Sequence, residues 1–166
     1  AFDLPKVWQF KNFLTVWQKG DMGRAFLNTI IMIGLTCAGS IMTGTMASYV
    51  LHRFDFKGKK LIKNLFLWIV LIPGTTAQVA RFQIVNALGL YNTMACPIIL
   101  ALGTDIMAIY IYLQFLDSIP VSLDESAIID GASYFRIYWN IILPLLKPAT
   151  VTCMILKGVS TYNEYY

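Results

Sequence analysis

Long apolar runs divide the chain into segments that could cross a membrane. Residues 25–51 form 27 consecutive positions without a charged side chain, more than the ~20 residues that a helix needs to span a bilayer. Residues 64–80 form a second uncharged run, and residues 95–116 contain Asp105 as their only charged residue. A fourth apolar stretch begins at Pro148. This pattern predicts four spans, and therefore an all-α, polytopic transmembrane helical bundle.

The second and third spans are separated by residues that favour turns. Pro73 and Gly74 lie within the second span and should bend or break it, because proline removes a backbone donor and clashes with the preceding turn. Residues 81–93, which include Gly89 and Asn92, are expected to form an external connector. The first span is rich in glycine, alanine and serine, which let helices approach closely in lipid.

The distribution of basic residues predicts which ends of the spans face the cytoplasm. Five Lys or Arg side chains fall within residues 52–63, whereas residues 1–24 hold four over twice that length. Cytoplasmic loops are enriched in Lys and Arg, so residues 52–63 should lie inside the cell. Residues 1–24 are predicted to be an external, interfacial segment. They mix aromatic and charged residues, without the apolar core and small-residue cleavage site of a secretory signal.

Composition agrees with a membrane protein and argues against several other classes. Hydrophobic residues make up 57% of the chain and charged residues only 13%. The net charge of +4 needs no nucleic acid as a partner, since the basic loops account for it. The three cysteines are scattered without metal-ligand spacing or an indicated disulfide, and the single histidine, His52, lies at a predicted membrane boundary. No metal or other cofactor is expected.

Residues 117–147 are polar enough to leave the membrane, and their pattern predicts a helix–turn–helix. Ser122 and Glu125 have the spacing of a capping box, and Gly131 can supply the positive φ that ends a helix. Ser133 can cap a second helix, and Pro144 can redirect the chain into the next span. Exposed apolar side chains in such a unit indicate a surface built for docking.

This segment resembles the cytoplasmic signature of ABC importer permeases, known as the EAA motif. The family pattern is Glu-Ala-Ala, three residues, Gly, nine residues, Ile, one residue and Leu-Pro. Every spacing agrees, and the one departure is a serine in place of the first alanine. The residues that match the ATPase-coupling loop of the family are Glu125, Ser126, Ala127, Gly131, Ile141, Leu143 and Pro144.

Weaker matches extend the resemblance over residues 25–166. Asn28-Thr29, Ala47-Ser-Tyr49, the run from Arg53 to Gly58, and Tyr162-Asn-Glu164 are similar to the maltose-type second permease. Members of this family have more spans than the chain does. The resemblance therefore implies a transmembrane region that lacks the first and last spans of the whole permease.

The resemblance implies a non-catalytic permease subunit of the bacterial inner membrane, one that imports a sugar or oligosaccharide. Its partners would be membrane lipid, a second permease subunit, a cytoplasmic ATPase dimer and an external substrate-binding protein. ATPase closure would be coupled to alternating access through the loop of residues 122–144. The chain has no phosphate-binding G-x-x-x-x-G-K-[ST] loop, so ATP hydrolysis would belong to the partner. Amino-acid or phosphate import is the alternative within the same family.

Four polar residues near the membrane interior are candidates for the transport pathway or for contacts between spans. Asp105 and Lys157 fall at the same predicted depth, and charges at this depth usually pair or line a polar cavity. Asn163 and Glu164 could line the pathway or hold the bundle together. A secondary transporter would need inverted repeats, and none is visible in the sequence. A membrane enzyme would need clustered ligands, which the scattered carboxylates do not provide.

Overall fold

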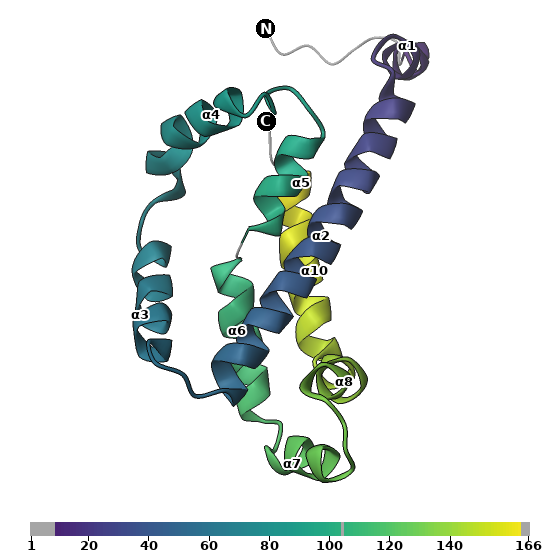
Figure 1. Ribbon diagram of the computed structural model, residues 1–166. Helices are drawn as coiled ribbons and strands as arrows, with labels where there is room; N and C mark the ends of the chain where they lie inside the picture. The colour runs from purple at the N-terminus through teal and green to yellow at the C-terminus, as the bar shows by residue number, and fades with distance from the viewer. Residues whose placement is uncertain (1–8, 104, 164–166) are drawn as a thin grey trace, which may run out of the picture.

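The computed structural model describes residues 9–103 and 105–163, and no strand occurs among them. The long helix α2 (Met22–Arg53) is the main element of the fold. Helices α5 (Ala95–Leu102), α6 (Ile106–Asp117) and α10 (Lys147–Tyr162) pack along it. Figure 1 shows this group as an elongated bundle, with α3 and α4 set to one side. The prediction of an all-α fold is confirmed.

The small residues of α2 allow close packing in the bundle. A Cβ atom added to Gly44 would lie 3.3 Å from the ring of Tyr112 on α6, and Gly39 similarly faces Leu102 on α5. The hydroxyl groups of α2 bond to its own carbonyls or across the bundle, as in the 2.7 Å contact between Thr45 Oγ1 and Tyr138 Oη. The expectation that this span has protein neighbours is confirmed.

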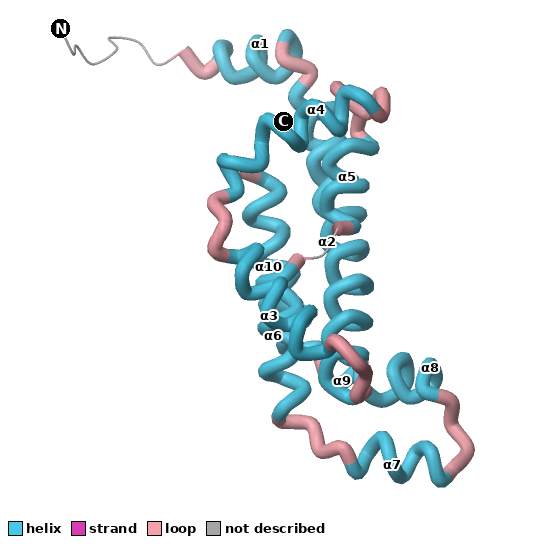
Figure 2. Tube along the Cα trace, turned by 60° about the vertical axis from the view of Figure 1, so that its left-hand side comes forward, coloured by secondary structure: helices cyan, strands magenta, loops and turns pink. Residues whose placement is uncertain are grey.

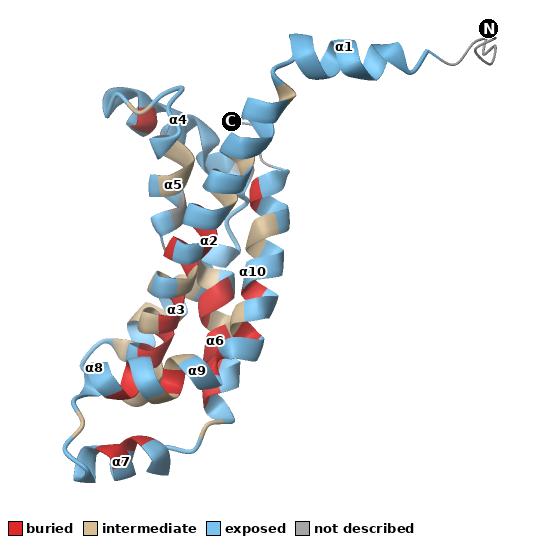
Figure 3. Cartoon of the chain, turned by 90° about the vertical axis from the view of Figure 1, so that its right-hand side faces the viewer, coloured by how far each residue is buried: buried red, intermediate tan, exposed pale blue. Residues whose placement is uncertain are grey.

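The N-terminal segment forms an exposed amphipathic helix. Helix α1 (Lys11–Lys19) contains no buried residue, and Figure 3 shows it extending away from the bundle beyond the start of α2. Trp17 stacks on Phe26, with ring centroids 5.9 Å apart, which connects α1 to α2. Residues 1–8 of the predicted interfacial segment lie outside the described residues. Its position relative to a membrane stays a prediction.

The predicted break in the second span is confirmed. Helix α3 (Lys59–Val70) ends shortly before Pro73, and a single 3₁₀ turn (Gly74–Ala77) follows. The predicted connector of residues 81–93 is wrong in its first half, because helix α4 (Gln78–Ala87) occupies it. Residues 78–87 contain neither glycine nor proline, so the helix continues until Gly89 at φ +68° and Asn92 at φ +56° turn the chain.

The predicted third span, residues 95–116, is divided into two helices. Helix α5 ends at Leu102, and Gly103 has an extended backbone with ψ 161°. Asp105 then starts α6, because its carboxylate accepts a hydrogen bond from the Ala108 N–H at 3.2 Å. A side-chain acceptor with extended backbone geometry is the usual N-cap arrangement. The one charge that interrupts the apolar run therefore marks a new helix start.

The four predicted spans do not appear as four straight helices. Within the described ranges, α2 alone is long and apolar enough to cross a membrane unaided. Two further spans are possible if each of two bent helix pairs crosses the membrane as a single broken span. Helices α6 and α7 (Ser122–Ile129) meet at 77°, and residues 134–145 meet α10 at 73°. The second predicted span contributes only the short helices on either side of Pro73.

The buried core lies near the end of α2 that carries Arg53. Its main cluster joins side chains from α2, α6, α10 and the segment between α8 and α10, and a smaller one joins α2 to α6. In Figure 3 the buried positions concentrate in this half of the bundle. The largest fully buried side chains are Tyr112, Ile109, Leu116, Ile137, Ile142 and Leu146.

Candidate functional site

The predicted helix–turn–helix forms a unit at one end of the molecule. Helix α7 follows α6 across a sharp bend, and α8 (Tyr134–Ile137) runs into a π-helical segment, Tyr138–Ile142. Figures 1 and 2 show α7 at the far end of the bundle from α1 and α4, connected to α8 by a loop. We call residues 120–137 the α7–α8 unit.

The start of α7 differs from the predicted capping box. Val121 precedes the helix with helical angles (φ −64°, ψ −26°), and the helix start has no side-chain cap. The Glu125 N–H donates to the Val121 carbonyl at 3.1 Å, so Ser122 already lies inside the helix. A capping serine needs a non-helical backbone, and the turn from Pro120 leaves Ser122 without one. Asp124 and Glu125 do lie in the first turn, where carboxylates complement the helix dipole.

The end of α7 has the geometry that the sequence predicts. Gly131 has φ +79°, and its N–H donates to the Ile128 carbonyl at 2.9 Å. The Ala132 N–H donates to the Ala127 carbonyl at 2.9 Å. These two bonds form a Schellman motif, which ends a helix and reverses the chain. Ser133 then caps α8 by accepting the Arg136 N–H at 3.4 Å, as predicted.

A buried ion pair ties α7 to the end of α2. Arg53 Nε lies 2.6 Å from Asp124 Oδ2, and their side chains are only 5% and 7% exposed. The two atoms are not aligned as a hydrogen bond, so the contact is mainly electrostatic. Other bonds orient both groups: the Arg53 guanidinium donates to the Ile119 carbonyl at 2.9 Å, and Tyr49 Oη donates to Asp124 Oδ1 at 3.4 Å. The α7–α8 unit is therefore fixed to α2.

The α7–α8 unit carries several exposed apolar side chains. Ile129 is 85% exposed and Phe135 is 65% exposed. Glu125 and Ser126 are also exposed, whereas Ala127 faces the core. Clustered apolar side chains on a polar loop mark an interaction surface. We use the name docking face for the exposed apolar residues of this unit: Val121, Leu123, Ile128, Ile129, Tyr134 and Phe135.

The second half of the signature has a packing role. Ile141 and Leu143 are partly buried against the main core. Pro144 lies in the short helix α9 (Leu143–Leu145), just before the 73° bend into α10. The bend itself lies between Leu145 and Lys147, directly before Pro148, so the prediction that Pro144 redirects the chain stays a prediction. The signature residues thus divide between an exposed part on α7 and a part that anchors the unit to the bundle.

The structure brings the two predicted membrane charges together. Lys157 Nζ lies 3.6 Å from Asp105 Oδ2, and each side chain is 23% exposed. Asn163 is exposed, and its amide donates to the Val159 carbonyl of its own helix at 2.9 Å. Glu164 lies outside the described residues. The pathway role proposed for these residues stays a prediction.

Sequence reasoning missed the partnership of Arg53 and Asp124. Arg53 was predicted only as part of the basic loop of residues 52–63, with no link to Asp124. No periodic pattern connects positions so far apart, so the sequence carries no signal for the pair. His52 likewise lies 2.8 Å from Asp117, which joins the ends of α2 and α6. Across the described ranges, no group of His, Cys, Asp and Glu could hold a metal ion.

Comparisons with known proteins agree on one family. The chain is 35% identical over 94% of its length to the melibiose/raffinose/stachyose import permease protein MelC of Bacillus subtilis, covering 57% of that protein. It is 43% identical over 78% of its length to the galactooligosaccharides transport system permease protein GanQ of the same organism, covering 46% of it. The chain therefore spans about half the length of the curated relatives it matches.

A solved structure has the same fold. A bacterial ABC transporter involved in the import of the acidic polysaccharide alginate matches with a TM-score of 0.76 at 24% identity, over 84% of this chain and 49% of that one. The model of the family described as "binding-protein-dependent transport system inner membrane component" matches residues 4–165. The chain therefore belongs to this family of transport-system inner membrane components.

Proposed function

We propose that the chain is part of a multi-pass permease subunit of an ATP-driven importer for a sugar or oligosaccharide. The printed names of the relatives support this substrate class, since they import melibiose, raffinose, stachyose and galactooligosaccharides. In this proposal the subunit works with a second permease, a cytoplasmic ATPase dimer and an external binding protein. The subunit itself catalyses no reaction.

The observation that carries the proposal is the docking face of the α7–α8 unit together with its buried anchor. Exposed apolar residues such as Ile129 are costly in water and would be covered by an ATPase subunit. The Arg53–Asp124 ion pair joins the same unit to α2. A movement of the docked ATPase would therefore reach the membrane helices through a contact that resists separation.

The proposed orientation puts this end of the molecule in the cytoplasm. Arg53, the first basic residue of the 52–63 segment, contacts the α7–α8 unit directly. Lys59 Nζ donates to Asp55 Oδ1 at 2.9 Å, and this bond lowers the pKa of the Asp55 carboxyl below its usual value. Loops rich in Lys and Arg stay on the cytoplasmic side of bacterial membranes.

Substitutions in the α7–α8 unit test the proposal in the complete importer. Gly131→Asp strains a backbone at φ +79°, and Glu125→Lys reverses a charge on the docking side. Both should leave membrane insertion intact, weaken co-purification of the ATPase subunits and abolish sugar uptake. Gly58→Asp is a matched control, because Gly58 also has a positive φ and open space around its Cβ position but lies in the α2–α3 loop.

The outcomes separate coupling from general damage. The proposal is supported if the two α7–α8 variants lose ATPase association and sugar uptake, while Gly58→Asp keeps ATPase association and sugar uptake. Normal uptake by Gly131→Asp and Glu125→Lys would overturn it. Equal loss in all three variants would assign the defect to backbone strain and overturn the specific role of the unit.

A further inference from the structure

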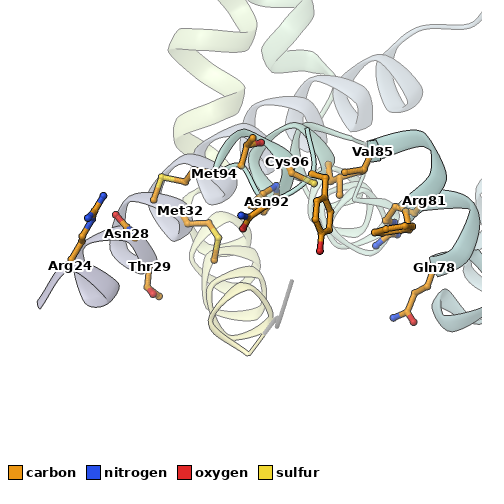
Figure 4. Close-up of a pocket in the computed structure, with 15 residues that line it drawn as sticks. Arg24, Asn28, Thr29, Met32, Gln78, Arg81, Val85, Asn92, Met94 and Cys96 are labelled. Carbon is orange, nitrogen blue, oxygen red and sulfur yellow. The ribbon is translucent and has the colours of Figure 1, made fainter. Parts of the chain in front are cut away.

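A second open site lies at the end of the bundle opposite the α7–α8 unit. It is a cavity of about 860 Å³ between the start of α2, helix α4 and the turn into α5. Small-molecule sites usually measure about 300–1,000 Å³. Figure 4 shows the polar side chains of α2 on one side of this cavity and those of α4 on the other, with Asn92 and Cys96 between them.

Among the described residues, the lining offers many hydrogen-bonding groups and no carboxylate. Three amide side chains come from three separate elements: Asn28 on α2, Gln78 on α4 and Asn92 in the turn. Two arginines, Arg24 and Arg81, also line the cavity. Arg81 has an interaction partner of its own, and the Arg24 guanidinium forms no ion pair with another described residue. Each amide both donates and accepts, whereas arginine only donates.

This mixture favours hydroxyl-rich ligands over phosphate groups. A sugar hydroxyl both donates and accepts, so it can use both ends of each amide. A phosphate group mainly accepts, so the amide carbonyls of Asn28, Gln78 and Asn92 would be left without partners, at a cost. Phe82 and Tyr91 add an edge-to-face aromatic pair, with centroids 5.5 Å apart. Exposed aromatic rings give the apolar C–H face of a sugar ring a surface to pack on.

The position of the cavity fits a site that meets ligand before the membrane is crossed. Arg24 and Arg53 lie 29 residues apart on α2, which is about 44 Å at a rise of 1.5 Å per residue. The cavity is therefore a full span away from the docking face. If the α7–α8 unit faces the cytoplasm, the cavity faces outward.

We propose that this outer cavity is a saccharide-binding site of the permease itself, with Asn28, Gln78 and Asn92 binding the hydroxyl groups of an incoming oligosaccharide. This inference rests on the proposed function, which supplies the ligand class and the outward orientation. It goes further by assigning a contact site for the ligand to this chain, separate from the external binding protein.

The native thiol of Cys96 allows a direct test, because it lines the cavity while Cys37 and Cys153 are buried. The complete importer is reconstituted in lipid vesicles and offered raffinose, maltotriose and galactotriose. The saccharide taken up fastest is used to protect Cys96 from an impermeant maleimide. The binding protein is omitted in this step, and glycerol serves as the solute control. At about ten times the Kd, mass action leaves about one site in ten empty, so labelling should slow about tenfold.

Paired variants on one helix show whether the protection comes from the cavity. Gln78→Ala should raise the saccharide concentration needed for half-protection by about three- to tenfold, the usual effect of one lost hydrogen bond. Gln83→Ala is the matched control, because Gln83 is an exposed residue of α4 outside the cavity lining. It should leave protection unchanged.

The possible results distinguish this inference from the proposed function. The site is supported if the importer takes up saccharide, saccharide protects Cys96 from labelling, and this protection weakens in Gln78→Ala but not in Gln83→Ala. Uptake without protection of Cys96 overturns the site and leaves the proposed function in place. Labelling that slows with phosphatidylglycerol in the vesicles, and not with saccharide, assigns the cavity to a lipid headgroup and also overturns the site. Failure to take up any saccharide counts against the proposed function, and with it the inference.

Discussion

Arg53 Nε and Asp124 Oδ2 lie 2.6 Å apart in a buried ion pair that joins the end of α2 to the first turn of α7. Neither side chain can reach water easily, because both are less than one-tenth exposed. The pair therefore holds the α7–α8 unit against α2 through a direct side-chain contact, in addition to the chain that connects them. This contact is the structural reason to expect that the two elements move together.

Replacing one partner of this ion pair should destabilise the permease more than replacing both partners with apolar residues. Asp124→Asn leaves the Arg53 charge buried without compensation, at a cost of about 3–5 kcal/mol. The double variant Arg53→Met with Asp124→Leu removes both charges and should recover much of the loss. Thermal unfolding of the purified permease, together with co-purification of the ATPase, measures both effects.

A surface pair nearby provides the control for this experiment. Lys59→Ala breaks the contact with Asp55, whose side chain is 98% exposed, and exposed ion pairs contribute little to stability. The unfolding temperature should therefore stay close to wild type. A loss in Asp124→Asn no larger than that in Lys59→Ala would contradict the role assigned to the buried pair.

The second ion pair, between Asp105 and Lys157, needs variants that keep the start of α6 intact. Asp105→Asn retains the oxygen that accepts the Ala108 N–H, but leaves Lys157 without its counter-charge. It should destabilise the permease by up to about 3 kcal/mol, the insertion cost of one membrane charge. Adding Lys157→Met should restore part of the stability. Additive losses, measured by unfolding in detergent, would show that the two charges do not interact.

Close packing between α2 and α6 depends on the missing side chain of Gly44. Gly44→Val would press on the Tyr112 ring, which already lies 3.3 Å from the position of the first added atom. Overpacking of this kind typically costs about 1–3 kcal/mol. Gly34→Val is the control, since no atom lies within 4 Å of its Cβ position. Equal unfolding temperatures for the two variants would contradict this packing.

The orientation of α1 can be tested with an introduced thiol. Gln18→Cys is preferable to a cysteine at Gly20, where the added Cβ atom would lie 2.8 Å from the Val16 carbonyl. In a background with Cys96→Ser, an impermeant maleimide should label Gln18→Cys in intact spheroplasts. Lys57→Cys, in the basic loop at the other end of α2, should react only after permeabilisation. The reverse pattern would invert the proposed topology.

Sequence reasoning predicted the elements that depend on local chemistry. The helix stop at Gly131, the cap at Ser133 and the break near Pro73 each follow from the backbone preferences of a few adjacent residues. Reasoning failed where two local signals competed. Ser122 had the spacing of a capping box, but the turn from Pro120 began the helix earlier.

Tertiary relationships were predictable only where a general constraint applied. Asp105 and Lys157 were expected to meet because isolated charges are costly inside a membrane, and equal depth made contact possible. No comparable constraint links Arg53 to Asp124, since both lie near the predicted membrane boundary, where charges are common. The outer cavity likewise arises from three elements whose relative positions the sequence does not encode locally.

The most direct test of the central claim, that the α7–α8 unit docks the ATPase, is photocrosslinking from the docking face. Benzoylphenylalanine replaces Ile129, which is 85% exposed on α7, or Val79, which is 69% exposed on α4 at the opposite end. In the assembled importer, irradiation should join position 129 to the ATP-binding subunit and give no such product from position 79. An ATPase adduct from position 79, or none from position 129, would contradict the account.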